Sequence, residues 1–195
     1  MRIGFLKALA ISGVLSAAGA LPAHAALIDT FEGNDCAGLF GQKFEECRVP
    51  EDLSGVKGGT PVIIKFEFNN DGDVTATFIN SALFPSIDGS EFSFDFGDDG
   101  NTGTGSWTYV QGAGDPEISV FAAKGGNIGF NLYSTEGDYS DVEFSTPNSP
   151  NGSPAGLSHL TFYDTDGDID ATEPGTLALL GLGLFAIGMS RRRRR

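Results

Sequence analysis

Residues 61–78 read PVIIKFEFNNDGDVTATF. Apolar side chains occupy alternate positions in residues 64–68 and again in residues 74–78. Side chains that recur with period two lie on one face of a strand, so both segments are predicted to be half-buried strands. The intervening Asn-Asp-Gly-Asp at residues 70–73 contains the Asp-Gly pair typical of a tight hairpin turn. The segment therefore predicts an antiparallel hairpin.

The same alternation continues along the chain. Phe92, Phe94 and Phe96 are separated by single polar residues. Further strands are predicted at residues 106–110, 117–122, 127–133, 141–145 and 158–163. No segment before the C-terminal tail shows a sustained helical period, and the crossover helices of a parallel sheet are missing. The pattern predicts an all-β fold, an antiparallel β-sandwich or jelly roll.

Composition restricts the partners of this body. The chain has 195 residues, which suits one domain, and a formal net charge of −14. Between residues 26 and 173, five Lys and Arg oppose all 26 Asp and Glu. Such a surface repels phosphate backbones, so we expect no nucleic-acid partner. The 16 Phe, four Tyr and one Trp provide apolar area that disordered chains lack.

The N-terminal end has the three parts of a secretory signal peptide. Arg2 and Lys7 make the start positive, residues 8–21 are mostly apolar, and Ala23 and Ala25 flank a small-x-small cleavage site. We therefore expect residues 1–25 to direct Sec export and to be removed by signal peptidase after Ala25. A membrane anchor is the alternative, but the apolar run is short and ends at a good cleavage site.

The C-terminal end predicts a single hydrophobic helix. Residues 174–190 are uncharged, and a helix of that length would span about 25 Å, slightly less than the ~30 Å hydrocarbon core. A stop-transfer block follows: Arg191, Arg192, Arg193, Arg194 and Arg195. Arginines remain on the cytoplasmic side, so the body is expected across the membrane from them. The alternative, a buried core helix, fits poorly with five terminal arginines.

This tail resembles a known sorting signal. Residues 173–184 read EPGTLALLGLGL, and together with the arginine block they closely resemble the PEP-CTERM signal of Gram-negative bacteria. In that family exosortase, a membrane-embedded protease-transpeptidase, recognises a Pro-Glu-Pro motif, removes the tail and passes the protein to the cell exterior. The corresponding residues here are Thr172, Glu173 and Pro174, with Thr where the family usually has its first Pro.

The resemblance implies a destination and partners. It implies an inner-membrane-anchored precursor that exosortase processes, and a mature protein at the cell surface or in the extracellular polysaccharide matrix. The chain then divides into a signal peptide (1–25), a β-sandwich domain with an N-terminal disulfide loop (26–163), an acidic linker (164–172) and a sorting and anchor segment (173–195).

The two cysteines, Cys36 and Cys47, are predicted to form a disulfide, because the exported part of the chain folds in an oxidising compartment. Closing a loop of this size contributes about 3 kcal/mol. A zinc site needs more ligands, and the mature chain has one histidine, His159, far along the sequence. Thiol catalysis lacks a nearby base.

Acidic clusters raise the question of calcium. The acidic run of residues 164–170 resembles the start of an EF-hand loop, but Ile169 and Gly175 stand where that loop needs Gly and Glu. The acidic turns at residues 71–73 and 98–101 are read as hairpin tips. We expect no cofactor, with weak calcium binding by the linker as the alternative.

No catalytic motif is present, so we expect a non-catalytic protein, with His159 in a hydrogen-bonded structural role. A glycoside hydrolase activity is not excluded by the sequence, because it needs only a pair of carboxylates and any two of the acids could be proposed. The alternative function is a carbohydrate- or calcium-binding module of the polysaccharide matrix. Its sugar platform would be aromatic, with Trp107 and Tyr109 aided by Tyr133 and Tyr139. Trp107 and Tyr109 share one strand face, so the opposing interpretation places both in the core.

Overall fold

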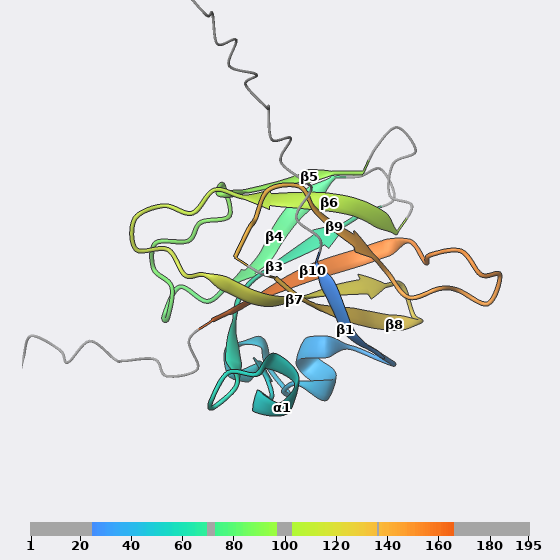
Figure 1. Ribbon diagram of the computed structural model, residues 1–195, viewed down its shortest axis with the longest axis horizontal. Helices are drawn as coiled ribbons and strands as arrows, with labels where there is room; N and C mark the ends of the chain where they lie inside the picture. The colour runs from blue at the N-terminus through green and yellow to red at the C-terminus, as the bar shows by residue number, and fades with distance from the viewer. Residues whose placement is uncertain (1–24, 70–72, 97–102, 136, 166–195) are drawn as a thin grey trace, which may run out of the picture.

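The computed structural model describes residues 25–69, 73–96, 103–135 and 137–165. Within these residues the predicted all-β class is confirmed, and strands follow one another with three short helical segments near the N-terminus (Figure 1). The strands are β1 (Ala26–Phe31), β2 (Arg48–Val49), β3 (Thr60–Phe68), β4 (Val74–Ile79), β5 (Phe92–Asp95), β6 (Thr104–Tyr109), β7 (Ile118–Gly125), β8 (Gly129–Ser134), β9 (Val142–Ser145) and β10 (Leu157–Asp164). The helical segments are η1 (Asp35–Leu39), η2 (Phe44–Glu46) and α1 (Glu51–Ser54).

Two antiparallel sheets form a sandwich. The larger sheet follows the order β1-β8-β7-β10-β3, and both β2 and β4 pair with β3 at its far edge. The smaller sheet has the order β5-β6-β9 and lies above the larger one in Figure 1. The hairpin predicted from residues 61–78 is the β3–β4 pair. The last strand, β10, lies between β7 and β3, so the C-terminal end of the body occupies the middle of the larger sheet.

An aromatic core fills the space between the two sheets. Phe66 of the larger sheet lies 5.2 Å from Phe92 of the smaller, between ring centroids. Trp107, fully buried, meets Phe162 edge to face at 4.9 Å. Edge-to-face pairs at such distances stabilise a core beyond the area they bury. As predicted, Phe alternates with polar residues in β5 because one face of this strand is turned toward the opposite sheet.

The second face of the larger sheet is also covered, which the alternation did not predict. The N-terminal segment, residues 32–59, lies mostly below this sheet in Figure 1 and packs Phe40 and Val49 against Val62, Leu132 and other buried side chains of the sheet. The expectation of half-buried strands is therefore wrong for β3, where eight of nine residues are buried. The molecule has three layers, because this segment occupies the face where solvent was expected.

The predicted disulfide is confirmed, and it lies inside the N-terminal segment. Cys36 and Cys47 are bonded, with their Cα atoms 5.4 Å apart, and their relative exposures are 2% and 1%. The bond joins η1 to the residue before β2 and so holds together a segment with few backbone ladder bonds. Its burial under the sheet keeps reductants in solution away from the sulfur atoms.

A glycine allows β1 to close the edge of the larger sheet. Gly129 begins β8 with a φ of +151°, and a Cβ atom at this position would lie 2.0 Å from the Phe31 carbonyl oxygen of β1. Any side chain here would push the two strands apart. The pairing of β1 with β8 therefore depends on this residue.

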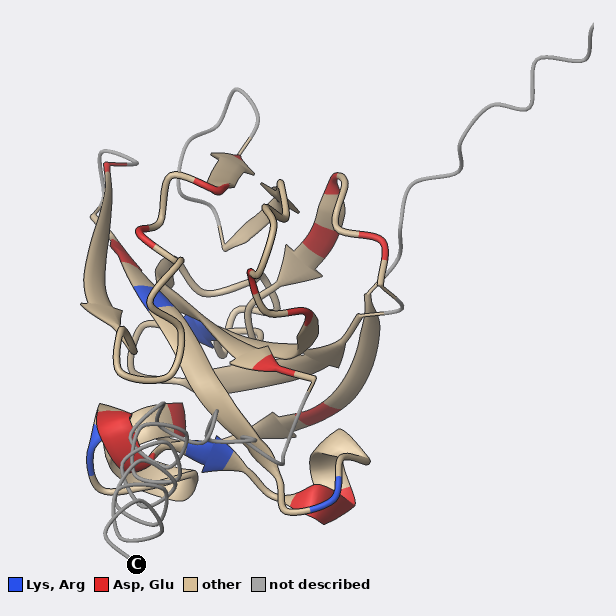
Figure 2. Cartoon of the chain, turned by 90° about the vertical axis from the view of Figure 1, so that its left-hand side faces the viewer, with Lys and Arg blue, Asp and Glu red and all other residues tan. Residues whose placement is uncertain are grey.

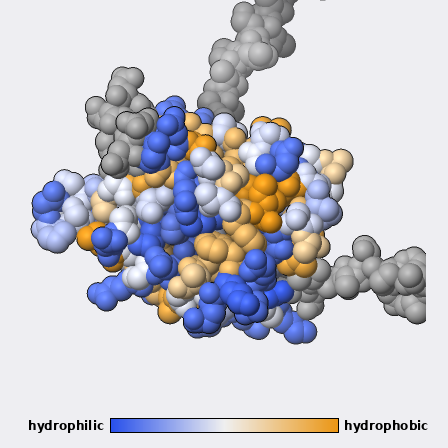
Figure 3. All heavy atoms as spheres, turned by 180° about the vertical axis from the view of Figure 1, so that it is seen from behind, coloured by the Kyte–Doolittle hydropathy of each residue, from blue (hydrophilic) through white to orange (hydrophobic). Residues whose placement is uncertain are grey.

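The surface keeps few large apolar side chains. Seen from behind, hydrophilic residues surround smaller hydrophobic areas (Figure 3). The exposed large hydrophobic residues of the described chain belong to different segments: Leu27, Leu39, Val74, Val110 and Ile128.

No helix in the described ranges is both long enough and apolar enough to cross a membrane. The predicted signal peptide, except Ala25, and the hydrophobic helix after residue 173 lie outside these ranges. Asp164, where the acidic linker was expected to begin, is still the last residue of β10.

Candidate functional site

The aromatic residues predicted as a sugar platform lie in the core. Trp107 has no exposed surface and Tyr109 is 4% exposed, because the shared face of β6 is turned toward the larger sheet. The Tyr109 hydroxyl donates to the Pro116 carbonyl at 2.9 Å. Tyr133 is buried as well, and Tyr139 packs partly buried against Trp107. The platform interpretation is therefore wrong for Trp107 and Tyr109.

A buried polar cluster joins the N-terminal segment to the larger sheet. Asp35 of η1 is fully buried, and one of its carboxylate oxygens lies 2.9 Å from Nε2 of His159 in β10. The other oxygen accepts a hydrogen bond from the Tyr163 hydroxyl at 3.1 Å. That hydroxyl also lies 3.5 Å from Cys36 Sγ and 3.8 Å from Cys47 Sγ. The predicted hydrogen-bonded role of His159 is thus confirmed, and its partner is 124 residues away in the sequence.

The charges in this cluster are set by burial and by one another. Burial raises the pKa of the Asp35 carboxyl, but the hydrogen bond and charge of His159 outweigh it and bring that pKa below 3.8. The buried Thr161 hydroxyl has no hydrogen-bond partner of normal geometry among the described residues, but it lies near Asp35 and helps to lower the pKa of that carboxyl. Burial, then the charge and hydrogen bond of Asp35, raise the pKa of Tyr163 well above 10.0. Burial lowers the pKa of Lys124, and the Asp35 charge opposes this.

This cluster resembles a base and its orienting carboxylate, but it is enclosed. The His159 side chain is 8% exposed and that of Asp35 is 0% exposed. A substrate would have to displace the N-terminal segment to reach either group. The geometry therefore suits a structural connection between η1 and β10. Asp35 carries no periodic signal, and the sequence analysis did not single it out; its position next to the disulfide cysteine Cys36 is the one local feature that could have drawn attention to it.

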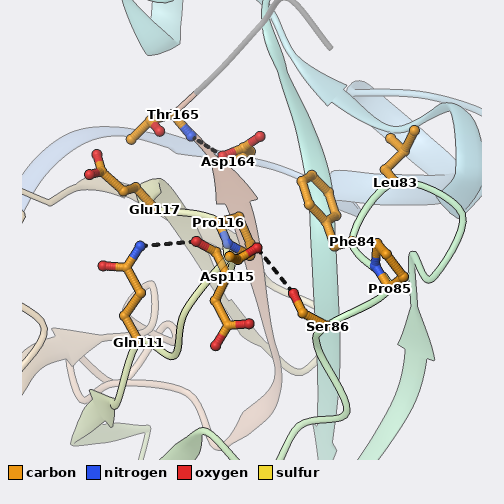
Figure 4. A pocket seen from close by; sticks show the side chains of 11 residues that line it. Leu83, Phe84, Pro85, Ser86, Gln111, Asp115, Pro116, Glu117, Asp164 and Thr165 are labelled. Carbon is orange, nitrogen blue, oxygen red and sulfur yellow. Dashed lines mark hydrogen bonds between the residues drawn. The ribbon is translucent and has the colours of Figure 1, made fainter. Parts of the chain in front are cut away.

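A second polar site opens at one end of the sandwich. It is a cavity of about 610 Å³ formed by three segments, residues 83–86 after β4, residues 111–117 between β6 and β7, and residues 164–165 at the end of β10. In Figure 4 Phe84 and Pro85 lie on one side of the cavity, and Asp115, Pro116 and Glu117 lie on the other. We refer to it as the end cavity. Its volume is in the range of small-molecule sites.

Hydrogen bonds brace the walls of the end cavity. Ser86 Oγ donates to the Gly114 carbonyl at 3.2 Å, which ties the first segment to the second (Figure 4). Gln111 Nε2 donates to the Asp115 carbonyl at 3.0 Å. The Thr165 amide donates to the Glu117 carbonyl at 3.1 Å, which ties the second segment to the third. The cavity is therefore held open by the fold itself.

The end cavity lies in a negative field. Burial, followed by the charges of Asp115 and Glu91, raises the pKa of the Tyr109 hydroxyl beneath it. Burial also raises the pKa of Tyr139, where the charges of Glu117 and Asp164 act in the same direction. Figure 2 shows acidic residues distributed over the described body and basic residues in only a few places. Loop residues of this kind carry no periodic pattern, so sequence reasoning did not find the cavity.

The outer face of the smaller sheet is polar too. Asp95, Ser106 and Glu143 are cross-strand neighbours on β5, β6 and β9, and they line a shallow depression of about 460 Å³. Asp95 and Glu143 already have partners. We therefore place no site here.

The acidic turns have no ligand geometry in the described chain. Asp73 closes the β3–β4 turn, where its carboxylate accepts from the Asn69 side-chain amide at 3.0 Å. The whole turn at residues 98–101 and, apart from Thr165, the acidic run after Asp164 lie outside the described ranges. Within those ranges, no three His, Cys, Asp or Glu side chains are grouped to hold one metal ion.

The predicted sorting residues Thr172, Glu173 and Pro174 and the arginine block lie beyond the described residues, and comparison with known families addresses them directly. The model of the PEP-CTERM protein-sorting motif matches residues 170–195. No curated protein and no solved structure matches the chain. The motif marks exported proteins that exosortase processes, and it begins six residues after the end of β10. The chain therefore consists of a β-sandwich body followed by a PEP-CTERM protein-sorting motif.

Proposed function

We propose that this protein is exported in two steps, first anchored in the inner membrane by its tail and then released by exosortase to the cell surface or the extracellular polysaccharide matrix. The match of the sorting motif to residues 170–195 carries this proposal. The arginine block after the apolar run supports the anchor, because arginines resist crossing the hydrocarbon core.

The distance between body and motif supports processing of a folded protein. Seven residues lie between Thr165, the last described residue, and Glu173, so eight Cα-to-Cα steps join the two. An extended chain covers at most about 3.6 Å per residue, so the motif can lie up to roughly 29 Å from the body. A membrane-embedded protease can therefore reach Glu173 and Pro174 without unfolding β10.

We further propose that the mature body is non-catalytic and works without a cofactor. The sole mature histidine, His159, is buried against Asp35, which supports a structural rather than a catalytic use of this pair. A binding role in the matrix remains the second candidate. The end cavity supports it, because it is open and braced, whereas Trp107 and Tyr109 are buried.

The sorting proposal is tested by the masses of the protein in membrane and exported fractions of cells that have an exosortase. The wild type should appear outside the cell with residues 1–25 and the C-terminal tail removed. The double variant Glu173→Ala/Pro174→Ala should stay in the membrane fraction at its anchored mass. Deleting residues 191–195 should instead give uncut precursor that passes through the export channel.

Two further variants serve as controls. Asp168→Ala changes an acid before the matched motif and should mature like the wild type. Thr172→Pro restores the usual first proline and should mature at least as fast. If the double variant and the deletion both mature like the wild type, the tail is a plain anchor and the sorting proposal fails.

A further inference from the structure

We propose that the end cavity binds an oligosaccharide that carries free amino groups. The proposal concerns the described body alone, so it neither needs the tail to be processed nor fails if the tail is a plain anchor.

The first argument is the shape of the cavity. Its volume is about 610 Å³, whereas one water molecule occupies roughly 30 Å³. An ammonium group or a metal ion is of similar size to a water molecule, so neither would fill the cavity alone. The rings of Phe84, Pro85 and Pro116 form apolar parts of its lining. Flat apolar surfaces suit the C–H faces of sugar rings, and polar groups around them fix orientation.

The second argument is the use of hydrogen-bond donors. The hydroxyl of Ser86 and the amide nitrogen of Gln111 donate to backbone carbonyls of the wall. The Gly112 amide donates to the Asp115 carboxylate at 2.7 Å. What the lining offers a ligand is therefore weighted toward acceptors, with the exposed Glu117 carboxylate and the Gln111 carbonyl among them. A ligand rich in donors satisfies such a lining.

The third argument is charge. Residues 66–123, between Lys65 and Lys124, contain no Lys or Arg, and residues 125–190 contain none either. All three lining segments fall in these two stretches, so the segment that carries Asp115 and Glu117 contains no Lys or Arg. A carboxylate accepts a hydrogen bond from either a hydroxyl or an ammonium group, but only the ammonium adds the attraction of an opposite charge, which favours an amine over a hydroxyl.

These arguments together define the ligand. Sugar rings fill the volume and contact the apolar walls, ring hydroxyls donate to the acceptors, and a protonated amino group pairs with Glu117 or Asp115. An acetylated amino sugar keeps the rings and loses the charge. Comparing the amino sugar with its acetylated form therefore separates the contribution of the sugar rings from that of the charge.

Binding is measured by calorimetry on the full chain purified from cells, with the glucosamine trimer as ligand and the N-acetylglucosamine trimer as its uncharged counterpart. The glucosamine trimer should bind at least tenfold more tightly than the acetylated trimer, and its affinity should fall as salt is raised. Glu117→Gln should weaken the binding about five- to tenfold, the loss expected for one charge-assisted hydrogen bond at an exposed site. Glu45→Gln removes one exposed charge from η2 on the N-terminal segment and should leave the affinity unchanged.

The proposal is overturned by equal binding of the two trimers, by no effect of Glu117→Gln, by no binding of the glucosamine trimer at millimolar concentration, or by equal loss of affinity in both variants. Trilysine and calcium chloride are tested in parallel. If trilysine binds as tightly as the glucosamine trimer, the cavity is a site for a basic peptide and the proposal fails. If calcium displaces the trimer and calcium binding is lost in Glu117→Gln, the cavity is a metal site and the proposal fails as well. The mass of the C-terminus in the same preparation reports on sorting separately.

Discussion

Replacing Asp35 by Ala removes the carboxylate that accepts from His159 and Tyr163, and it leaves His159, also buried, without its partner. The His159 ring and the Tyr163 hydroxyl then stay buried without this partner, and each buried polar group left unsatisfied costs about 1–3 kcal/mol, so we expect a total loss of about 3–5 kcal/mol. For a domain of this size that corresponds to a fall in Tm of roughly 10–15 °C. The N-terminal segment should loosen first, since Asp35 lies in η1.

The assay is thermal unfolding followed by circular dichroism under non-reducing conditions. Asp52→Ala, at an exposed acid of α1, is the matched control and should change the free energy of unfolding by at most about 0.5 kcal/mol. A double-mutant cycle with His159→Ala should give a coupling energy of about 0.5–3 kcal/mol. If Asp35→Ala unfolds at the same temperature as Asp52→Ala, or the cycle gives no coupling, the connection between η1 and β10 has been overestimated.

The same pair predicts a pH dependence. The pKa of Asp35 is lower in the folded chain than its ordinary value of 3.8, so the folded state favours the ionised carboxylate. Its contribution to stability is present above that ordinary value and is lost as the pH falls through the lower folded pKa. The difference in Tm between the wild type and Asp35→Asn should therefore be constant near neutrality and shrink below about pH 4. A difference that grew on acidification would contradict this assignment.

Four other outcomes are expected. Replacing Cys36 and Cys47 together by Ser should lower the free energy of unfolding by about 3 kcal/mol, and the wild type should show no free thiol when unfolded without reductant. Acrylamide should hardly quench the fluorescence of Trp107, the single tryptophan, until the body unfolds. Gly129→Ala should destabilise the body by about 1–3 kcal/mol in urea unfolding, because its Cβ atom would meet the Phe31 carbonyl. N-terminal sequencing of the exported protein should begin at Ala26, and an intact Met1 there would exclude signal cleavage.

Much of the sandwich was predictable because its strands alternate. Phe92 and its alternate neighbours mark a face that must be buried, and such patterns are local. The disulfide was predictable as well, since two cysteines in an exported chain leave one intramolecular pairing. The sorting motif was readable because its residues are consecutive.

The rest depended on contacts between distant segments. Whether Trp107 faces solvent or the core is decided by the position of the larger sheet, which the sequence of β6 does not contain. The coverage of the second face of β3 depends on the N-terminal segment, whose packing residues follow no period. Asp35 and His159 meet only because β10 lies in the middle of the larger sheet. The end cavity is built mainly by loops, whose residues are often charged and follow no apolar periodicity that would mark a site.

The central position of β10 also sets the order of events during export. β10 is the last of the described strands to be synthesised, and in the export proposed above it would be the last of them to leave a channel that passes the chain from N- to C-terminus. Until it emerges, β7 and β3 have no common neighbour, and Asp35 lacks His159 and Tyr163 as docking partners. The body would consequently stay incompletely folded, and able to pass through the channel, for almost the whole of this proposed export. In this proposed route, folding would be completed only when the sorting motif, which begins six residues beyond Asp164, has itself reached the membrane.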